Sequence, residues 1–96
     1  VSDASWPTVS VIMPVLNEEK HLRAAVESVL EQAYPHPFDL CLALGPSTDA
    51  TDDVARSLMA ENPRVSTVTN PTGRRVTGLN LAIAATHGDV VVRVDG

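Results

Sequence analysis

The chain has 96 residues and a formal charge of -5, from seven basic and twelve acidic side chains. This length limits it to one domain with a modest core, and the acidic balance disfavours nucleic acid or an anionic membrane, since both bind clusters of basic residues. With one cysteine, Cys41, no internal disulfide can form, and no apolar stretch approaches the roughly 18 residues of a membrane span, so we expect a soluble, cytoplasmic chain.

Residues 1–8 carry no recognisable chemistry, and we expect them to be a flexible lead-in to a domain over residues 9–96. Residues 9–19 read V-S-V-I-M-P-V-L-N-E-E. The nearly continuous apolar run predicts a strand covered on both faces of a parallel sheet. Pro14 marks the end of the strand, because it donates no backbone hydrogen bond. Asn17 can cap the helix that follows, with Glu18 in its electropositive first turn.

Helix and strand patterns alternate along the rest of the chain. The expected order is a helix over 18–32, a strand over 38–44, a polar turn over 45–51, a helix with its apolar stripe at Val54, Ala55, Leu58 and Met59, a strand over 64–69, a helix over 74–86 and a strand over 89–94. The strand over 64–69 has the alternation expected near a sheet edge.

This order, β-α-β-α-β-α-β with short connections, predicts an α/β fold with right-handed crossovers and a Rossmann-like parallel sheet. A doubly wound domain normally continues past such a final strand. We therefore expect the chain to be the amino-terminal part of a larger protein, with an exposed edge strand that would permit self-association.

The third predicted helix has its apolar stripe at Val76, Leu79 and Ile83. Gly78 lies inside this helix at a cost of about 1 kcal/mol relative to alanine, which indicates close packing or close approach of a ligand. Asn80 shares a face with Val76 and Ile83, so we expect it to bond a strand end or to face a ligand.

Polar residues follow three of the predicted strands: Asn17 and Glu18, then residues 47–51, then Asp95. In a parallel sheet these three clusters lie at one edge, where α/β proteins bind ligands. Each cluster alone has a structural explanation, as first-turn acids, helix caps or an Asp-Gly hairpin turn. Arg74 and Arg75 could meet phosphates or could be solvated.

The motifs G-x-G-x-x-G, G-x-x-x-x-G-K-[ST] and G-x-S-x-G are all absent from the sequence. Their absence disfavours a dinucleotide oxidoreductase, a P-loop NTPase and an α/β-hydrolase. What remains is a sheet edge rich in carboxylates and hydroxyls, which suits ribose hydroxyls and a hard divalent cation that neutralises a diphosphate.

Four segments resemble family 2 glycosyltransferases, in the right order and over nearly the whole chain. Residues 9–19 resemble the family's opening V-S-V-I-x-P-x-x-N-E-E, and residues 45–51 its S-t-D-g-T turn. Residues 78–88 are similar to its G-x-N-x-A-I-x-x-A-x-G helix, and residues 90–95 to the strand that carries the first aspartate of D-x-D. The segment L-G-P-S-T-D further resembles the bacterial exopolysaccharide subgroup that includes succinoglycan-type glucosyltransferases.

The resemblance implies the amino-terminal half of a glycosyltransferase A-type domain. Such a domain binds a nucleoside-diphosphate sugar, usually a UDP-sugar, with Mg²⁺ or Mn²⁺, and transfers the sugar with inversion to a saccharide or lipid-linked acceptor. The implied donor-binding residues are Pro14, Asn17 and Glu18 in the nucleoside pocket, Gly45 and Asp49 beside the base, Asn80 near the donor, and Asp95 at the ribose or the metal.

The sequence departs from the family pattern in three places. Leu44 and Gly45 stand where many members have two aspartates, so a backbone contact would have to recognise uracil. Leu79 replaces the arginine that commonly precedes Asn80. The chain ends at Gly96, before the rest of D-x-D and before the expected catalytic base, so we expect donor binding without transfer, and any membrane attachment would be encoded downstream.

The alternative from another class is a non-catalytic α/β scaffold or a receiver-like domain. A receiver needs an aspartate at the end of its third strand to accept a phosphoryl group. Here that strand ends in Val68, Thr69 and Asn70, which disfavours a receiver.

Overall fold

The computed structural model describes residues 8–32, 38–86, 88 and 90–94. Its elements, in chain order, are β1 (Val9–Val15), α1 (Leu22–Leu30), β2 (Asp39–Leu44), α2 (Thr51–Glu61), β3 (Val65–Thr69), α3 (Arg75–Ala85) and β4 (Val90–Arg93). The predicted alternation of strands and helices is therefore confirmed.

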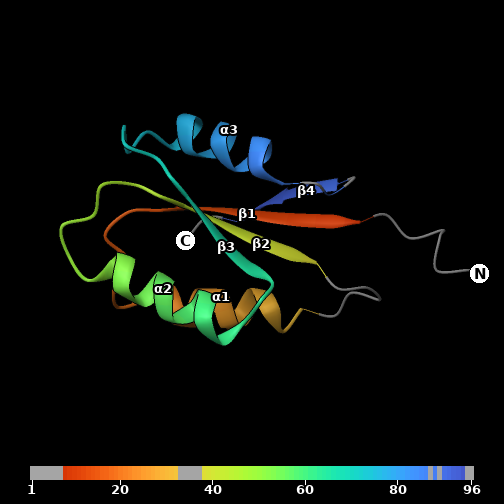
Figure 1. Ribbon diagram of the computed structural model, residues 1–96, viewed down its shortest axis with the longest axis horizontal. Helices are drawn as coiled ribbons and strands as arrows, with labels where there is room; N and C mark the ends of the chain where they lie inside the picture. The colour runs from red at the N-terminus through yellow and green to blue at the C-terminus, as the bar shows by residue number, and fades with distance from the viewer. Residues whose placement is uncertain (1–7, 33–37, 87, 89, 95–96) are drawn as a thin grey trace, which may run out of the picture.

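The four strands form one parallel sheet in the order β3-β2-β1-β4. Helices α1 and α2 cover one face of the sheet and α3 covers the other (Figure 1). The Rossmann-like parallel sheet is thus confirmed, as is the position of β3 at an edge. Since all strands run in the same direction, the loops that follow them emerge at one end of the sheet.

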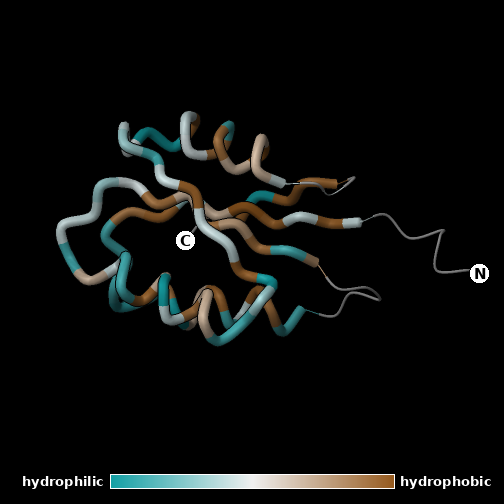
Figure 2. Tube along the Cα trace, viewed as in Figure 1, coloured by the Kyte–Doolittle hydropathy of each residue, from teal (hydrophilic) through white to brown (hydrophobic). Residues whose placement is uncertain are grey.

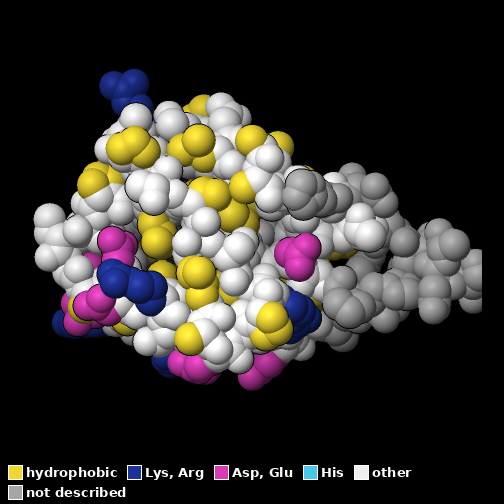
Figure 3. Space-filling model, viewed as in Figure 1, with side chains coloured by type: hydrophobic (Ala, Val, Ile, Leu, Met, Phe, Trp, Pro, Cys, Tyr) yellow, Lys and Arg dark blue, Asp and Glu magenta, His cyan; other side chains and the backbone are white. Residues whose placement is uncertain are grey.

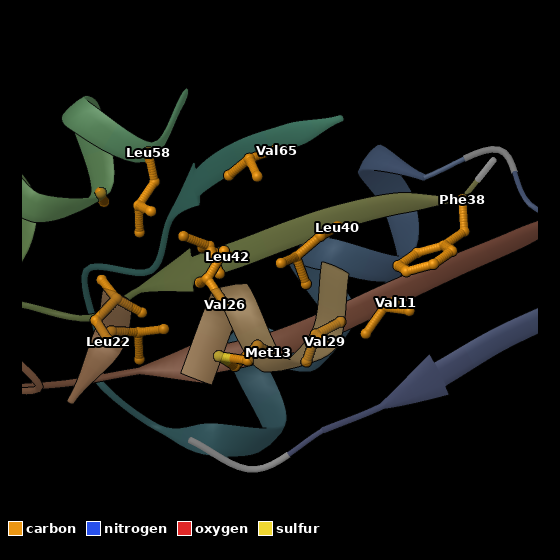
Figure 4. Close-up of a cluster of buried hydrophobic side chains, with 12 residues drawn as sticks. Val11, Met13, Leu22, Val26, Val29, Phe38, Leu40, Leu42, Leu58 and Val65 are labelled. Carbon is orange, nitrogen blue, oxygen red and sulfur yellow. The ribbon is translucent and has the colours of Figure 1, made fainter. Parts of the chain in front are cut away.

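Two apolar layers, one on each face of the sheet, pack the sheet against its helices. Strand β1 contributes to both layers, because its successive side chains point to opposite faces. Val11, Met13 and Val15 belong to the larger layer, with residues of β2, α1 and α2 (Figure 4). Ile12 points to the other face and packs in the smaller layer with Cys41, Ala43 and Ala82. In Figure 2 much of the sheet is brown, although β3 is paler, and teal segments gather in the loops and on helices α1 and α2.

The segment around Pro14 differs from the sequence prediction in two ways. Strand β1 continues through Pro14, which pairs with Ala43 of β2, and this is tolerated because the pairing of β1 with β4 already ends at Ile12. Helix α1 begins at Leu22, with His21 at its N-cap position and no capping side chain. The prediction that Asn17 caps this helix is therefore wrong.

The predicted apolar stripe of α3 is also wrong in part. Val76 is 69% exposed and Ile83 is 48% exposed, whereas the buried residues of the helix are Gly78 and Ala82. A Cβ atom at position 78 would lie 3.3 Å from the Cβ of Ala43. The helix thus approaches the sheet through its smallest side chains, and its larger ones turn outward.

Apolar side chains also remain exposed at the other edge of the sheet, where Val90, Val91 and Val92 of β4 are each about 40% accessible. On the face shown in Figure 3, further hydrophobic side chains lie over α3. None of the helices in the described part of the chain is long and apolar enough to cross a membrane. The predicted lead-in lies outside the described residues except for Thr8, which is exposed.

Candidate functional site

The loops after β1 and β2 lie against each other and are joined by reciprocal hydrogen bonds. The backbone N–H of Asn17 donates to Ser47 Oγ over 2.9 Å, and the backbone N–H of Thr48 donates to Asn17 Oδ1 over 2.8 Å. Asn17 has a left-handed backbone with φ of 51°, a conformation that asparagine adopts more readily than most residues. Its side chain therefore fixes one loop to the other.

A second group of bonds is built around Thr51, which is fully buried at the start of α2. Its Oγ1 accepts a hydrogen bond from the backbone N–H of Glu18 over 2.8 Å and donates its own proton to Asp49 Oδ1. The carboxylate of Asp49 also accepts from the backbone N–H of Thr51 at 3.0 Å and of Glu19 at 3.3 Å. These bonds, that from the Thr51 hydroxyl foremost, lower the pKa of Asp49 from its ordinary value.

The loop between β3 and α3 is held by Asn70, a polar residue that is only 3% exposed. Its backbone N–H donates to the carbonyl of Leu44 over 2.7 Å, which ties the loop to the end of β2. Its side-chain amide donates to the carbonyl of Arg74 over 2.9 Å, and its Oδ1 accepts from the Thr72 hydroxyl over 2.8 Å. Asn70 thereby sets where the chain enters α3.

The three loops meet at two glycines, Gly45 and Gly73. A Cβ at position 45 would lie 3.1 Å from Leu16 Cδ1, 3.3 Å from the carbonyl oxygen of Val15 and 3.4 Å from the Cα of Gly73. Gly73 itself has φ of +67°, and a Cβ there would lie 3.1 Å from Pro46 Cδ. A side chain at position 45 would have to displace Leu16 or the Val15 carbonyl by a few tenths of an ångström, and one at position 73 would also be strained by its positive φ, so glycine suits both positions.

These loops enclose a polar hollow of about 220 Å³ at the carboxyl ends of β1, β2 and β3. Two of its lining residues carry a charge, Glu18 from the loop after β1 and Arg75 from the first turn of α3. The lining consists of Pro14, Val15, Leu16, Glu18, Ala43, Gly45, Asn70, Gly73 and Arg75. We call this the strand-end pocket. It has the place and the chemistry of a ligand site in an open α/β sheet.

A larger hollow of about 420 Å³ lies between α1 and β4, on the α1 face of the sheet. Its lining is mainly apolar, with Val9, Val11, Val29, Phe38 and Val92 among its members and no ionisable side chain. With no group that could bind a charge or move a proton, it is a poorer candidate for chemistry than the strand-end pocket.

The predicted site residues of the first two loops fall in or beside the strand-end pocket. Pro14, Glu18 and Gly45 line it. Asn17 and Asp49 are not among its lining residues, and their polar side-chain atoms bond the two loops to each other. The predicted convergence of the first two polar clusters at one edge is therefore confirmed, although part of each cluster serves the loops themselves.

The remaining predicted residues are not brought into this group. Asn80 is exposed on α3 and is not among the residues that line the pocket. Asp95, the predicted metal ligand, lies outside the described residues. Within the described ranges no three His, Cys, Asp or Glu side chains are placed to hold a metal ion. The described residues therefore do not form a metal site by themselves.

The sequence analysis singled out Arg75 of the segment after β3 but not Asn70 and Gly73, which also line the pocket. The signal was present in the order Asn70-Pro71-Thr72-Gly73, because an asparagine before a tight turn often bonds the backbone of that turn. This segment forms one wall of the site.

A parallel sheet whose strand-end loops enclose a polar pocket defines a ligand-binding α/β protein of the Rossmann-like class. Residues 10–96 match the family model described as "Glycosyl transferase family 2". Because this match covers most of the sequence, the chain belongs to glycosyltransferase family 2.

Individual relatives agree with this assignment. The chain is 33% identical over 87 residues to the succinoglycan biosynthesis protein ExoA of Rhizobium meliloti (strain 1021), a match that covers 88% of this chain and 26% of ExoA. The chain thus spans about a quarter of the length of this curated relative.

Two solved structures share the fold. A mannosyltransferase, PcManGT from Pyrobaculum calidifontis, in complex with GDP-Man and Mn²⁺, has a TM-score of 0.79 and 29% identity, covering 93% of this chain and 27% of that one. A glucosyl-3-phosphoglycerate synthase from Mycobacterium tuberculosis, in complex with Mn²⁺, UDP and phosphoglyceric acid, has a TM-score of 0.68 and 26% identity, covering 95% and 33%. The parallel sheet is thus that of the glycosyltransferase A-type fold.

Proposed function

We propose that this chain forms the donor-binding part of a glycosyltransferase. The enzyme transfers a sugar from a nucleoside-diphosphate sugar, in the first place a UDP-sugar, to a saccharide or lipid-linked acceptor with inversion. The observation that carries the proposal is the polar strand-end pocket in a chain of family 2. Similarity to a succinoglycan biosynthesis protein supports a role in polysaccharide or cell-envelope glycan synthesis.

In this proposal Pro14, Glu18 and Gly45 contact the nucleoside, because they line the pocket. Asn17 and Asp49 contribute to donor binding indirectly, because their hydrogen bonds fix the loops after β1 and β2 to each other. Asn80 is retained as a residue near the donor. It is exposed on α3 and therefore accessible to a ligand that extends beyond the pocket.

We further propose that Mg²⁺ or Mn²⁺ binds with the donor through Asp95, and that the catalytic base is supplied from beyond Gly96. A bound cation would stabilise the charge that develops on the departing diphosphate. Both solved structures described above contain Mn²⁺, which supports a divalent cation here.

Titration calorimetry of the full-length protein with UDP, GDP, ADP and TDP, each with and without Mn²⁺, tests the proposal. We expect one nucleotide to bind tightly and only with the metal. Asp95→Asn should abolish the metal dependence and leave the melting temperature unchanged, because the proposed role of Asp95 is ligand contact.

The opposite outcome has a specific meaning. If none of the nucleotides binds, the hydrogen bonds of Asn17, Asp49 and Thr51 serve the loops alone. The protein would then be better explained as a non-catalytic scaffold, because these side chains already have hydrogen-bond partners within the two loops.

A further inference from the structure

The start of α3 is held by a ring of hydrogen bonds from the loop before it. Arg74 occupies the N-cap position of the helix and makes no capping bond with its side chain. Its backbone N–H donates to Thr72 Oγ1 over 3.1 Å, and its carbonyl accepts from Asn70 Nδ2 over 2.9 Å. The Thr72 hydroxyl donates to Asn70 Oδ1 over 2.8 Å, which closes the ring. The backbone on both sides of Arg74 is therefore fixed by residues that precede the helix.

Asn70 also joins this ring to the sheet. Its backbone N–H donates to the carbonyl of Leu44, at the end of β2, over 2.7 Å, and its carbonyl accepts from the N–H of Gly73 over 3.3 Å. Because Asn70 is only 3% exposed, a bond that it loses cannot be replaced by one to bulk water. One buried side chain thus sets the position of α3 and of its loop relative to β2.

The sequence of α3 leaves room for this side chain. A Cβ at position 78 would lie 2.8 Å from Asn70 Nδ2 and 3.6 Å from Asn70 Cγ. Glycine at position 78 lowers the helix propensity, and in return the amide group of Asn70 can lie between the helix and the Arg74 carbonyl. The close approach that Gly78 indicates in the sequence is therefore an approach to Asn70.

The loop held in this way forms one wall of the strand-end pocket, since Asn70, Gly73 and Arg75 are among the lining residues. We propose that Asn70 is a positioning residue for donor binding, and that its side-chain amide fixes this wall before the donor arrives. The inference rests on the proposed function. Without the amide, the loop would have to become ordered during binding, and the lost conformational entropy would weaken the affinity.

Asn70→Asp tests the amide with the smallest change of shape. The new carboxyl group can still accept from the Thr72 hydroxyl, but in its ionised form it places a negative oxygen against the Arg74 carbonyl. In its protonated form it donates a hydrogen bond, as the amide does. Burial and the neighbouring carbonyl should raise the pKa of this carboxyl group above its ordinary value, so that moderate acid protonates it.

Titration calorimetry of the full-length protein, with Mn²⁺ and the tightest binder among UDP, GDP, ADP and TDP, measures the effect. The dissociation constant of Asn70→Asp is divided by that of the wild-type protein at the same pH. We expect a ratio of about ten at about pH 7.5, the usual effect of losing one buried hydrogen bond, and a ratio near one at about pH 5.5. Thr72→Val, at an exposed position, breaks the same ring and should weaken binding at both pH values. It provides a second variant in case Asn70→Asp does not fold.

Asn62→Asp is the matched control. The side chain of Asn62 also holds a loop, by accepting from the backbone N–H of Arg64 over 3.0 Å, but this loop precedes β3, at the opposite end of the sheet from the pocket. The dissociation constant should not change. Val65→Ala, a substitution of a buried residue at the start of β3, controls for stability and should lower the melting temperature without weakening binding.

A ratio near one for Asn70→Asp at about pH 7.5 would overturn the proposal, as would equal weakening by Val65→Ala. Weak binding that does not recover in acid would also overturn it, because the donated hydrogen bond would not be the cause. If the wild-type protein binds none of the four nucleotides, the proposed function fails and this inference fails with it. The wild-type titration therefore distinguishes the two failures.

Discussion

The carboxylate of Asp49 accepts hydrogen bonds from both of the loops that it joins, which predicts how the protein responds to acid. The pKa of Asp49 is lowered in the folded chain, chiefly by the Thr51 hydroxyl. A lowered pKa stabilises the fold fully above the unfolded value of about 3.9, and this contribution is lost as the pH falls through the lower folded value. Asp49→Asn should therefore reduce the free energy of unfolding at pH 7 and flatten its decline below about pH 4.

Urea denaturation between pH 3 and pH 7 measures this effect. Asp39→Asn is the control, because Asp39 is an exposed acid at the start of β2, away from the loops. It should change neither the stability at pH 7 nor the steepness of the acid decline. A variant at Asp49 that matches the wild-type curve would mean that its bonds to Thr51 and Glu19 contribute nothing measurable.

Residue types alone could not separate the capping role of these side chains from the bonds that they make between loops. Asn17, Asp49 and Thr51 are all favourable at helix starts, and the sequence indicates no more than that. Asp49 does bond the first N–H of α2, but Asn17 lies too far before Leu22 to cap α1. Which partner each side chain takes is decided by how the two loops meet, and that depends on the sheet.

At the scale of elements, α3 shows why the inner face of a helix is not always its most apolar one. If the large side chains of Val76 and Ile83 faced the sheet, they would hold the helix away from it. The small residues Gly78 and Ala82 face the sheet instead and allow the helix to pack closely against Ala43. The helical periodicity correctly predicted the position of α3 in the sequence. It did not predict the buried face, because it takes account of side-chain hydrophobicity and not of side-chain size. Strands β1 and β2 were easier to predict, because their apolar runs are buried on both faces of the sheet.

Gly78→Ala tests this close approach. A Cβ at position 78 would lie 2.8 Å from Nδ2 of Asn70, the atom that bonds the carbonyl of Arg74. We expect a net loss of about 1 to 3 kcal/mol from overpacking, despite the gain of about 1 kcal/mol in helix propensity. Chemical denaturation followed by circular dichroism measures it.

Asn80→Ala, on the exposed side of the same helix, is the companion variant and should change stability by no more than about 0.5 kcal/mol. If Gly78→Ala were as stable as the wild-type protein, or more stable, α3 would not approach Asn70 and Ala43 as closely as the distances at position 78 indicate.

At the scale of the whole molecule, the exposed valines of β4 bear on association. An apolar edge strand with free pairing groups favours contact between copies, and a lysine at such an edge opposes it. Val91→Lys should therefore reduce self-association of the chain, measured by sedimentation velocity over a range of concentrations. Val91 is 39% exposed, so the change should be tolerated by the fold.

Ser57→Lys, on the exposed side of α2, adds the same charge away from the edge and should leave the association unchanged. If both variants associate like the wild type, or if the wild type is monomeric throughout, β4 is not an association surface in this chain.

The contact between Gly45 and Gly73 also has an evolutionary consequence. Position 16 touches the same point, so three loops that are far apart in the sequence share one small volume. A larger residue at position 45 or 73 requires a neighbouring loop to give way, and these positions should therefore change together among homologues. A lineage that places an acid at position 45 must also reshape the loop after β3, and with it the wall that holds Arg75. In such a lineage, a change of ligand preference would therefore require substitutions in all three loops together.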